Sequence, residues 1–279
     1  MVAQILDGKI VAEKLKQRTK HQIGLFPVQI TLAVCLVGDD PASVVYVNNK
    51  RKACEGIGIK GIVQTFPSST SQRIVTDWIR WANESKEVTG ILVQLPLPEE
   101  FDRLRVLRSI NPLKDVDCFH PENQGLLMSG SPRFKPCTPD GIMKILEHYD
   151  IETKGKHIVI INRSIVVGQP LASLLSQEGN ATVTMCHEYT KDIQDITKTA
   201  DIIITAVGKP GFRLSADMVS YNQVVIDVGI YRENGKIRGD SVFEEVSQIV
   251  RAITPVPGGV GPVTIAMLLN NTAKAYTVR

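Results

Sequence analysis

The segment KHIVIINRSIVVGQP (156–170) decides the fold, because a β-branched run ends there in a turn of small and polar residues. Three similar runs follow it: ATVTMC (181–186), ADIIITAVG (200–208) and QVVIDVG (223–229). Nearly continuous apolar runs are typical of parallel strands that are covered on both faces. Helical patterns separate the runs, so we expect right-handed βαβ units and a doubly wound parallel sheet.

The turn after the first run has the character of a dinucleotide-binding loop. Such a loop brings backbone amides at a helix N-terminus close to a pyrophosphate, and it therefore needs small residues. Ser164 and Gly168 meet this need, but Asn162 stands where the first glycine of G-x-G-x-x-G is usual. Asparagine tolerates a positive φ better than most residues, so we expect the turn to survive. An ordinary βα turn is the alternative.

Two later strand ends and one acidic residue favour the dinucleotide interpretation. TAVGKPG (205–211) and IDVGI (226–230) end their runs in small residues, and ligands of open α/β sheets bind at such carboxyl ends. Glu188 lies 20 residues beyond Gly168, where a carboxylate accepts hydrogen bonds from the ribose 2′-OH of NAD. Arg163 instead suits a 2′-phosphate. Alternatively, the two side chains pair with each other or with solvent.

The first half of the chain shows the same alternation of patterns. Strands are predicted at QITLAVCLVG (29–38), GIVQTF (61–66) and TGILVQL (89–95), with helices near 42–57 and 72–84 between them. A chain of 279 residues suits two domains of ordinary size. We therefore expect two α/β domains, the second of them a Rossmann-type sheet.

The domain boundary is expected near PCTPDG (136–141), where prolines and a glycine precede a helix pattern. Residues 1–138 then form the first domain and residues 139–259 the dinucleotide-binding domain. The last segment, 260–279, has the pattern of an apolar helix with no strand after it. We expect this helix to pack back on the first domain.

One helix of the first domain carries a lysine among apolar neighbours. Asp40 is a candidate N-cap and Pro41 the first helical residue. Tyr46, Lys50 and Ile57 then fall at i, i+4 and i+11 on one face. Partial desolvation would lower the pKa of Lys50 and equip it for proton transfer near neutral pH. The alternative is a lysine whose stem packs while its head reaches water.

Polar residues follow the third predicted strand. Gln94 ends that strand and Pro96 stops it, which places an amide suited to orienting a substrate at the strand's carboxyl end. Asp115 and Asp117 lie in the loop NPLKDVDCFHPEN (111–123). These carboxylates are either ligand contacts or turn formers.

Composition narrows the classes of partner. The net charge of +3 comes from dispersed charges with no basic, aromatic-rich run, so nucleic acid is not an expected partner. No stretch approaches the roughly 20 apolar residues of a membrane span. Five widely spaced cysteines suit free thiols in a reducing cytoplasm. Cys118 and His120 lack a second ligand pair, so no metal site is expected.

Together, these segments resemble a known family. YVNNKRKACEGIGI, GILVQLPLP, NPLKDVDCFHPEN, PCTPDG, NRSIVVGQP, AVGKPG, IDVGI and ITPVPGGVGPVT occur in that order over essentially the whole chain. The sequence is similar to the bifunctional methylenetetrahydrofolate dehydrogenase/methenyltetrahydrofolate cyclohydrolase family. VQLPLP and TPVPGGVGP are its most specific strings.

The resemblance implies oxidation of 5,10-methylenetetrahydrofolate with NAD(P), followed by hydrolysis of the methenyl product to 10-formyltetrahydrofolate. It implies a catalytic cleft between the two domains and a homodimer joined through the nucleotide domains. Tetrahydrofolate one-carbon derivatives are the implied substrates. NADP is the cofactor that the family predicts, and NAD is an option because of Glu188.

The resemblance also assigns roles to residues of this chain. Lys50 is the implied catalytic lysine, Gln94 its partner, Asp117 the residue that holds the pterin, and Tyr46 the ring that stacks on the ligand. Further implied substrate contacts are Leu95, Pro96, Pro257, Gly258 and Gly259. The implied cofactor contacts are Asn162, Arg163, Ser164, Gly168, Glu188, Ala206, Ile230 and Thr264.

Three positions depart from the family pattern. Asn162 replaces the glycine of the G-R-S turn, Glu188 replaces a serine that helps hold the 2′-phosphate, and Cys118 replaces the glycine of K-D-V-D-G-F. A glutamate near the 2′-phosphate weakens NADP binding by about 1 to 3 kcal/mol unless Arg163 compensates. We therefore expect weak discrimination for NADP over NAD, or feeble dehydrogenase activity. Cys118 replaces a residue of unusual φ, which bears on the pterin contact of Asp117.

Three rival functions share parts of this pattern. One is a cyclohydrolase that has largely lost hydride transfer because of Asn162 and Glu188. A dehydrogenase of a small hydroxy or amino acid is disfavoured by VQLPLP and TPVPGGVGP. A non-catalytic nucleotide-binding or interaction protein is disfavoured by the intact set of Tyr46, Lys50, Gln94 and Asp117.

Overall fold

The computed structural model describes residues 3–278, and the chain folds into two compact units. Residues 1–13 and 138–264 form one unit, called here the six-stranded unit after its sheet. Residues 14–137 and 265–279 form the other, the three-stranded unit. The two units assign residues 1–13 differently from the domain ranges expected from the sequence, and those ranges stay a prediction.

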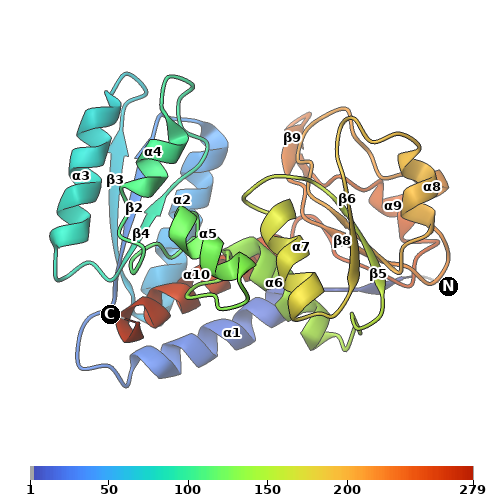
Figure 1. Cartoon of the computed structure of the whole chain (residues 1–279), viewed down its shortest axis with the longest axis horizontal. Helices are drawn as coiled ribbons and strands as arrows, with labels where there is room; N and C mark the ends of the chain where they lie inside the picture. The colour runs from blue at the N-terminus through green and yellow to red at the C-terminus, as the bar shows by residue number, and fades with distance from the viewer. Residues whose placement is uncertain (1–2, 279) are drawn as a thin grey trace. The chain divides into compact units, whose positions relative to one another are not determined.

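The six-stranded unit contains a parallel sheet with the order β1-β11-β8-β7-β5-β6. Figure 1 labels three of its strands, β5, β6 and β8. Its strands are β1 (Gln4–Ile5), β5 (His157–Ile161), β6 (Thr182–Cys186), β7 (Ile202–Thr205), β8 (Val224–Asp227) and β11 (Ala252–Ile253). All four strands expected in the second half of the chain are present. The order reverses at β5, which lies between β6 and β7. Open α/β sheets bind ligands at the carboxyl ends of strands beside such a switch point.

The other elements that lie wholly within this unit are short. They are α7 (Gly168–Gln177), α8 (Ile193–Lys198), η1 (Ala216–Met218), α9 (Phe243–Val246) and the antiparallel pair β9 (Tyr231–Glu233) and β10 (Lys236–Arg238). The buried core joins side chains of β5, β7 and β8 to Met218 and Val246. Strands that are buried on both faces explain why these runs lack a polar alternation.

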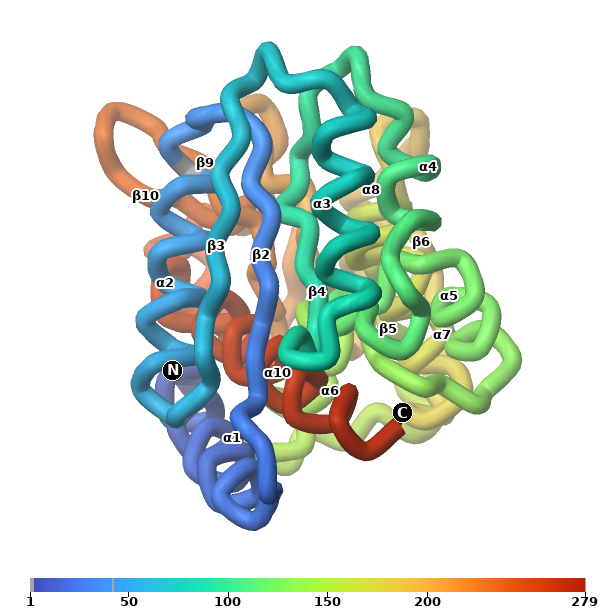
Figure 2. Tube along the Cα trace, turned by 90° about the vertical axis from the view of Figure 1, so that its left-hand side faces the viewer, coloured from blue at the N-terminus to red at the C-terminus, as the bar shows by residue number. Residues whose placement is uncertain are grey.

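The three-stranded unit holds a second parallel sheet, with the order β3-β2-β4. Figure 2 shows these three strands side by side. The elements are β2 (Thr31–Val37), α2 (Pro41–Ile57), β3 (Lys60–Phe66), α3 (Gln72–Glu84), β4 (Gly90–Val93), α4 (Arg103–Arg108) and α5 (Pro121–Met128). The chain passes from β2 through α2 to β3, and then from β3 through α3 back across β2 to β4. Right-handed crossovers in opposite directions place α2 and α3 on opposite faces (Figure 1).

Three helices contain residues of both units: α1 (Gly8–Ile23), α6 (Cys137–His148) and α10 (Val260–Thr277). Within the three-stranded unit, Asn271 of α10 donates to the carbonyl oxygens of Val116 and Lys135, at 2.9 and 2.8 Å. These bonds hold α10 against the segments that precede and follow α5. Among residues 3–278, no helix combines the length and apolar character that a membrane span requires.

The start of α2 matches the sequence expectation. The Asp40 carboxylate accepts a hydrogen bond from the Ser43 amide at 2.8 Å, and Pro41 begins the helix. The helix ends at Gly58, whose φ of 90° is readily adopted only by glycine. Both ends of the helix that carries Lys50 are therefore defined by local chemistry.

We predict that Asp40→Ala lowers the free energy of unfolding by about 1 kcal/mol, because the Ser43 amide in the first turn of α2 loses its acceptor. Thermal unfolding followed by circular dichroism measures the effect. Asp39→Ala is the matched control, since it removes the neighbouring carboxylate and leaves the cap. Equal unfolding temperatures for the two variants would contradict the capping role.

Candidate functional site

The structure places Lys50 inside the three-stranded unit and gives its amine a partner. Lys50 is 6% exposed, and its Nζ donates to the Gln94 Oε1 at 3.0 Å. The Gln94 Nε2 donates to the carbonyl oxygen of Leu95 at 2.7 Å, which fixes the direction of the amide oxygen. The alternative of a lysine head in open water is wrong for this residue.

Tyr46 lies one helical turn before Lys50, and the Lys50 Nζ is 5.3 Å from the centroid of its ring. A cation at this distance from an aromatic ring is attracted by the ring's quadrupole. Burial raises the pKa of Tyr46 to about 12, and the negative charge of Asp117 contributes to this rise. The phenol therefore stays protonated at neutral pH.

Asp117 belongs to the same neighbourhood. Its charge acts on Tyr46 and also on Cys137, whose pKa is raised first by burial and then by Asp117. Asp117 itself is half-buried, while Val116 and Cys118 on either side are buried. The structure thus gathers Tyr46, Lys50, Gln94 and Asp117, all four residues expected at the catalytic centre.

The positions of Lys50 and Gln94 follow from the sheet. Gln94 comes directly after β4, and its backbone amide still bonds the Cys35 carbonyl of β2 at 2.8 Å. Lys50 is on α2, which begins at the carboxyl end of β2. The order of this sheet reverses at β2, so the lysine and the amide meet where parallel sheets bind ligands.

In the six-stranded unit, the Asn162 side chain closes the turn after β5. Its Oδ1 accepts from the Ser164 amide (2.8 Å), the Ser164 hydroxyl (2.7 Å) and the Gly168 amide (3.0 Å). Its Nδ2 donates to the Ala206 carbonyl at 2.6 Å. Asn162 is not among the residues of positive φ, so the expected role of a left-handed backbone was wrong. The turn survives through side-chain hydrogen bonds instead.

Gly168 fits this turn because it has no side chain. A Cβ at this position would lie 2.2 Å from the Asn162 carbonyl oxygen and 2.9 Å from its Oδ1. The close approach brings the first turn of α7 against the end of β5. The helix therefore begins at the carboxyl edge of the sheet, where open α/β folds bind their ligands.

The loops after β7 and β8 meet at the same edge. Gly208 has a φ of +61°, and a Cβ added at this position would lie 3.6 Å from the backbone of Ile230. The buried Asp240 carboxylate fixes the first loop by accepting from the Val207 amide (2.7 Å) and the Gly208 amide (2.9 Å). Ile230 remains 45% exposed, which leaves an apolar side chain for a ligand ring.

A second buried carboxylate, Asp227, holds the segment around Asp240 in place. It accepts from the backbone amides of Asp240 (3.0 Å), Ser241 (2.8 Å) and Gly229 (3.1 Å). Burial raises the pKa of Asp227 to about 6, and the charge of Asp240 acts in the same direction. Sequence reasoning missed Asp240, because no local pattern links it to a loop more than thirty residues away.

Arg163 and Glu188 form an ion pair, as one of the sequence interpretations proposed. The Arg163 Nη2 donates to the Glu188 Oε1, and the guanidinium lies 5.6 Å from the centroid of the Tyr189 ring. The backbone amide of Glu188 and the Arg163 guanidinium hold the pKa of this carboxyl below its ordinary value. The pair lies after β5 and β6, where a dinucleotide's adenosine ribose is bound in such folds.

Other expected site residues have local partners. The Thr264 hydroxyl shares a hydrogen bond with Thr138 at 3.1 Å. Gly258 has a φ of +112°, and the Gly259 amide bonds the Pro255 carbonyl at 2.8 Å. The Leu95–Pro96 and Val256–Pro257 peptide bonds are cis. Within residues 3–278, no group of three or more His, Cys, Asp or Glu side chains is arranged to hold a metal ion.

The residues at the carboxyl edge of the six-stranded sheet fit a nicotinamide dinucleotide. Four features lie directly after strands β5 to β8: the turn that Asn162 closes, the start of α7, the loops at Gly208 and Ile230, and the Arg163–Glu188 pair. Fold and sites together define a two-domain α/β protein with a dinucleotide-binding domain.

Comparison with known families agrees over nearly the whole chain. Residues 6–117 match the catalytic domain of tetrahydrofolate dehydrogenase/cyclohydrolase, and residues 136–279 match the NAD(P)-binding domain of the same family. The chain belongs to the tetrahydrofolate dehydrogenase/cyclohydrolase family, as the sequence resemblance predicted.

Individual relatives are similar from end to end. The chain is 51% identical to the bifunctional protein FolD of Campylobacter hominis, over 98% of this chain and 96% of that protein. It is 50% identical to the FolD protein of Aquifex aeolicus, over 99% and 96%. The crystal structure of the bifunctional FolD enzyme of Campylobacter jejuni superposes with a TM-score of 0.94 at 47% identity, covering 99% of both chains.

A further solved relative was described with a bound cofactor. The Trypanosoma brucei methylenetetrahydrofolate dehydrogenase-cyclohydrolase, in complex with NADP and an inhibitor, is 34% identical with a TM-score of 0.94. It covers 100% of this chain and 98% of its own.

We predict that Gly168→Ala lowers the free energy of unfolding by about 1 to 3 kcal/mol, because the added Cβ meets the Asn162 backbone. Dinucleotide binding should weaken with it, since the start of α7 must shift. Gly125→Ala on α5 is the control, because nothing lies within 4 Å of its Cβ position. Thermal unfolding and calorimetric titration with NADP measure both effects, and a wild-type result for Gly168→Ala would contradict the tight turn.

Proposed function

We propose that this protein oxidises 5,10-methylenetetrahydrofolate to 5,10-methenyltetrahydrofolate with NAD(P), and then hydrolyses the product to 10-formyltetrahydrofolate. The observation that carries the proposal is the buried Lys50 amine, bonded to Gln94 next to the Tyr46 ring. Membership of the family over both halves of the chain supports both activities. Nothing in the comparisons favours a cyclohydrolase that lacks the dehydrogenase activity.

The proposed roles in the three-stranded unit follow from the chemistry of each side chain. The Tyr46 ring provides an apolar face on which a flat pterin ring stacks. The Asp117 carboxylate accepts hydrogen bonds from the pterin's amino and ring N–H groups. Gln94 fixes the direction of the Lys50 Nζ, because its amide oxygen accepts a hydrogen bond from that nitrogen.

Hydrolysis is the step in which the lysine acts. Water that attacks the methenyl cation must lose a proton as the carbon–oxygen bond forms, and ring opening requires a proton on the departing nitrogen. An amine held at a fixed position moves protons between these atoms at Nζ. Since Lys50 is only 6% exposed, bulk water does not compete for its hydrogen bonds.

The proposed dinucleotide contacts are Asn162, Arg163, Ser164, Gly168, Glu188, Ala206, Ile230 and Thr264. When bound, NAD(P) supplies the hydride acceptor for the oxidation. The turn between β5 and α7 lies where such folds bind the pyrophosphate, and Ile230 offers an apolar side chain for a ring. The Arg163–Glu188 pair gives one group suited to a 2′-phosphate and one suited to a 2′-hydroxyl.

The same proposal includes substrate contacts by Leu95, Pro96, Pro257, Gly258 and Gly259. It also includes the domain ranges 1–138 and 139–259, with the helix 260–279 packed on the first. A homodimer through the six-stranded unit is supported by β6, an edge strand whose Met185 is 43% exposed. Five free, buried cysteines support a cytoplasmic location.

We predict that Lys50→Met abolishes hydrolysis of methenyltetrahydrofolate while folate binding stays measurable, because the variant keeps the apolar stem and loses the amine. Methenyl absorbance follows the hydrolysis, and ligand titration measures binding. Lys52→Met is the matched control, since Lys52 is exposed on the same helix. Wild-type hydrolysis by Lys50→Met would overturn the assignment of the lysine.

We predict that Glu188→Gln tightens NADP relative to NAD by about five- to a hundredfold, because a negative charge near the 2′-phosphate is removed and Arg163 is released from its partner. Calorimetric titration of NAD and NADP, side by side, gives this ratio without an activity assay. Glu152→Gln removes a charge elsewhere and is the control. A wild-type preference for NADP above about a hundredfold would contradict the role of Glu188.

A further inference from the structure

The loop that carries Asp117 is fixed to α3 at its start. The Lys114 Nζ donates to the carbonyl oxygens of Ala82 (2.9 Å), Asn83 (2.7 Å) and Ser85 (2.8 Å) at the C-terminal end of that helix. Lys114 is 7% exposed. A buried ammonium is stable there because the last carbonyls of a helix carry partial negative charge.

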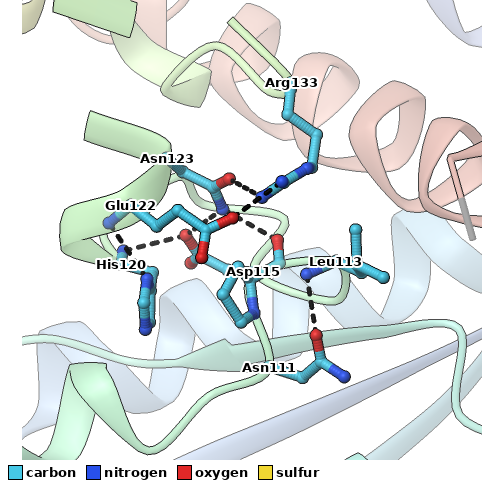
Figure 3. Close-up of polar contacts among 8 residues, drawn as sticks. Asn111, Leu113, Asp115, His120, Glu122, Asn123 and Arg133 are labelled. Atoms are coloured by element: carbon cyan, nitrogen blue, oxygen red, sulfur yellow. Dashed lines mark hydrogen bonds and ion pairs between the residues drawn. The ribbon is translucent and has the colours of Figure 1, made fainter. Parts of the chain in front are cut away.

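The next residue, Asp115, is the centre around which the loop folds. Its carboxylate is buried and accepts hydrogen bonds from the Phe119 amide (3.2 Å), the His120 amide (2.8 Å) and the Asn123 Nδ2 (2.8 Å). Figure 3 shows His120 and Asn123 beside Asp115. Residues 116–118, which include Asp117, therefore form the short segment between Asp115 and the residues whose amides bond its carboxylate.

Arg133 determines which way the Asn123 amide faces. Its Nη1 donates to the Asn123 Oδ1 at 2.7 Å, and its Nη2 contacts Glu122 at 2.7 Å (Figure 3). A guanidinium only donates, so the amide oxygen must face Arg133. The amide nitrogen is thereby directed to Asp115 and to the Pro112 carbonyl, the latter at 2.8 Å.

The two residues next to Asp117, Val116 and Cys118, make hydrogen bonds of their own to other parts of the unit. The Val116 carbonyl accepts from the Asn271 Nδ2 at 2.9 Å. Cys118 has a φ of 62°, and its Sγ–H donates to the Phe134 carbonyl at 3.1 Å, while its own carbonyl accepts from Gln124. Both neighbours of Asp117 are buried, but Asp117 itself is half-buried and its charge reaches Tyr46.

We propose that Arg133 is a positioning residue for folate binding, which acts through Asn123 and Asp115 to hold the Asp117 carboxylate in place. This proposal rests on the proposed folate contact of Asp117. A loop that is fixed before the ligand arrives loses less conformational entropy on binding. Because Asp117 holds the pterin in the ground state and the transition state alike, its loosening affects KM rather than kcat.

The experiment compares Arg133→Met and Arg133→Lys in the full-length protein. Arg133→Met removes both hydrogen bonds, and we expect the KM for 5,10-methylenetetrahydrofolate to rise about three- to thirtyfold with kcat within about twofold of wild type. Arg133→Lys keeps one donor for the Asn123 Oδ1, so it should recover most of the affinity. Arg80→Met, which breaks the exposed pair with Asp77 on α3, is the matched control and should leave both constants unchanged.

Asp117→Asn and the double variant Asp117→Asn/Arg133→Met complete a thermodynamic cycle. If Arg133 acts through Asp117, Arg133→Met raises KM in the wild-type background and adds nothing in the Asp117→Asn background. An unchanged KM in Arg133→Met, beside a raised KM in Asp117→Asn, overturns the positioning role alone. Full additivity, or an equal loss of kcat in both backgrounds, also overturns it. A wild-type KM in Asp117→Asn instead overturns the folate contact itself.

Discussion

The hydrogen bond from Lys50 to Gln94 pairs a buried nitrogen with an amide oxygen. An unpaired polar group at 6% exposure would be costly, so the amide oxygen must already point at the lysine nitrogen. The bond between the Gln94 side chain and its neighbouring carbonyl sets this direction. Strand order then determines the rest, because β4 must lie beside β2 for the amide to reach a lysine on the helix after β2.

The strands β2 to β8 could be predicted from the sequence, because each contains a run of apolar or β-branched residues. β1 and β11, of two residues each, were not predicted, because so short a strand has no such pattern. The N-cap at Asp40 could also be predicted, because its partner is three residues away. Lys50 could be placed on an apolar face by helical periodicity, and Gln94 at a strand end by the prolines that follow. The resemblance to a family added the grouping of these residues with Asp117.

What could not be predicted depends on contacts between distant residues. Asn162 was expected to keep its turn through a positive φ, but its side chain replaces the missing glycine by accepting three hydrogen bonds. Asp240 fixes the loop at Gly208 from 32 positions away. Asp115 looked like Asp117 in the sequence, yet Asp115 is the carboxylate that three donors enclose. A sequence pattern records polarity, but it does not record which way a polar group faces.

The five thiols have a shared property that extends beyond folding. Each cysteine is free and buried, and burial raises the pKa of Cys35 and of Cys54 to about 12. Since thiolates are the reactive form, electrophiles and oxidants find almost no target while the native packing persists. Alkylation by a small reagent would then proceed only as fast as the chain opens around each thiol. The rate of alkylation of each cysteine therefore measures the rate of local unfolding in its half of the protein.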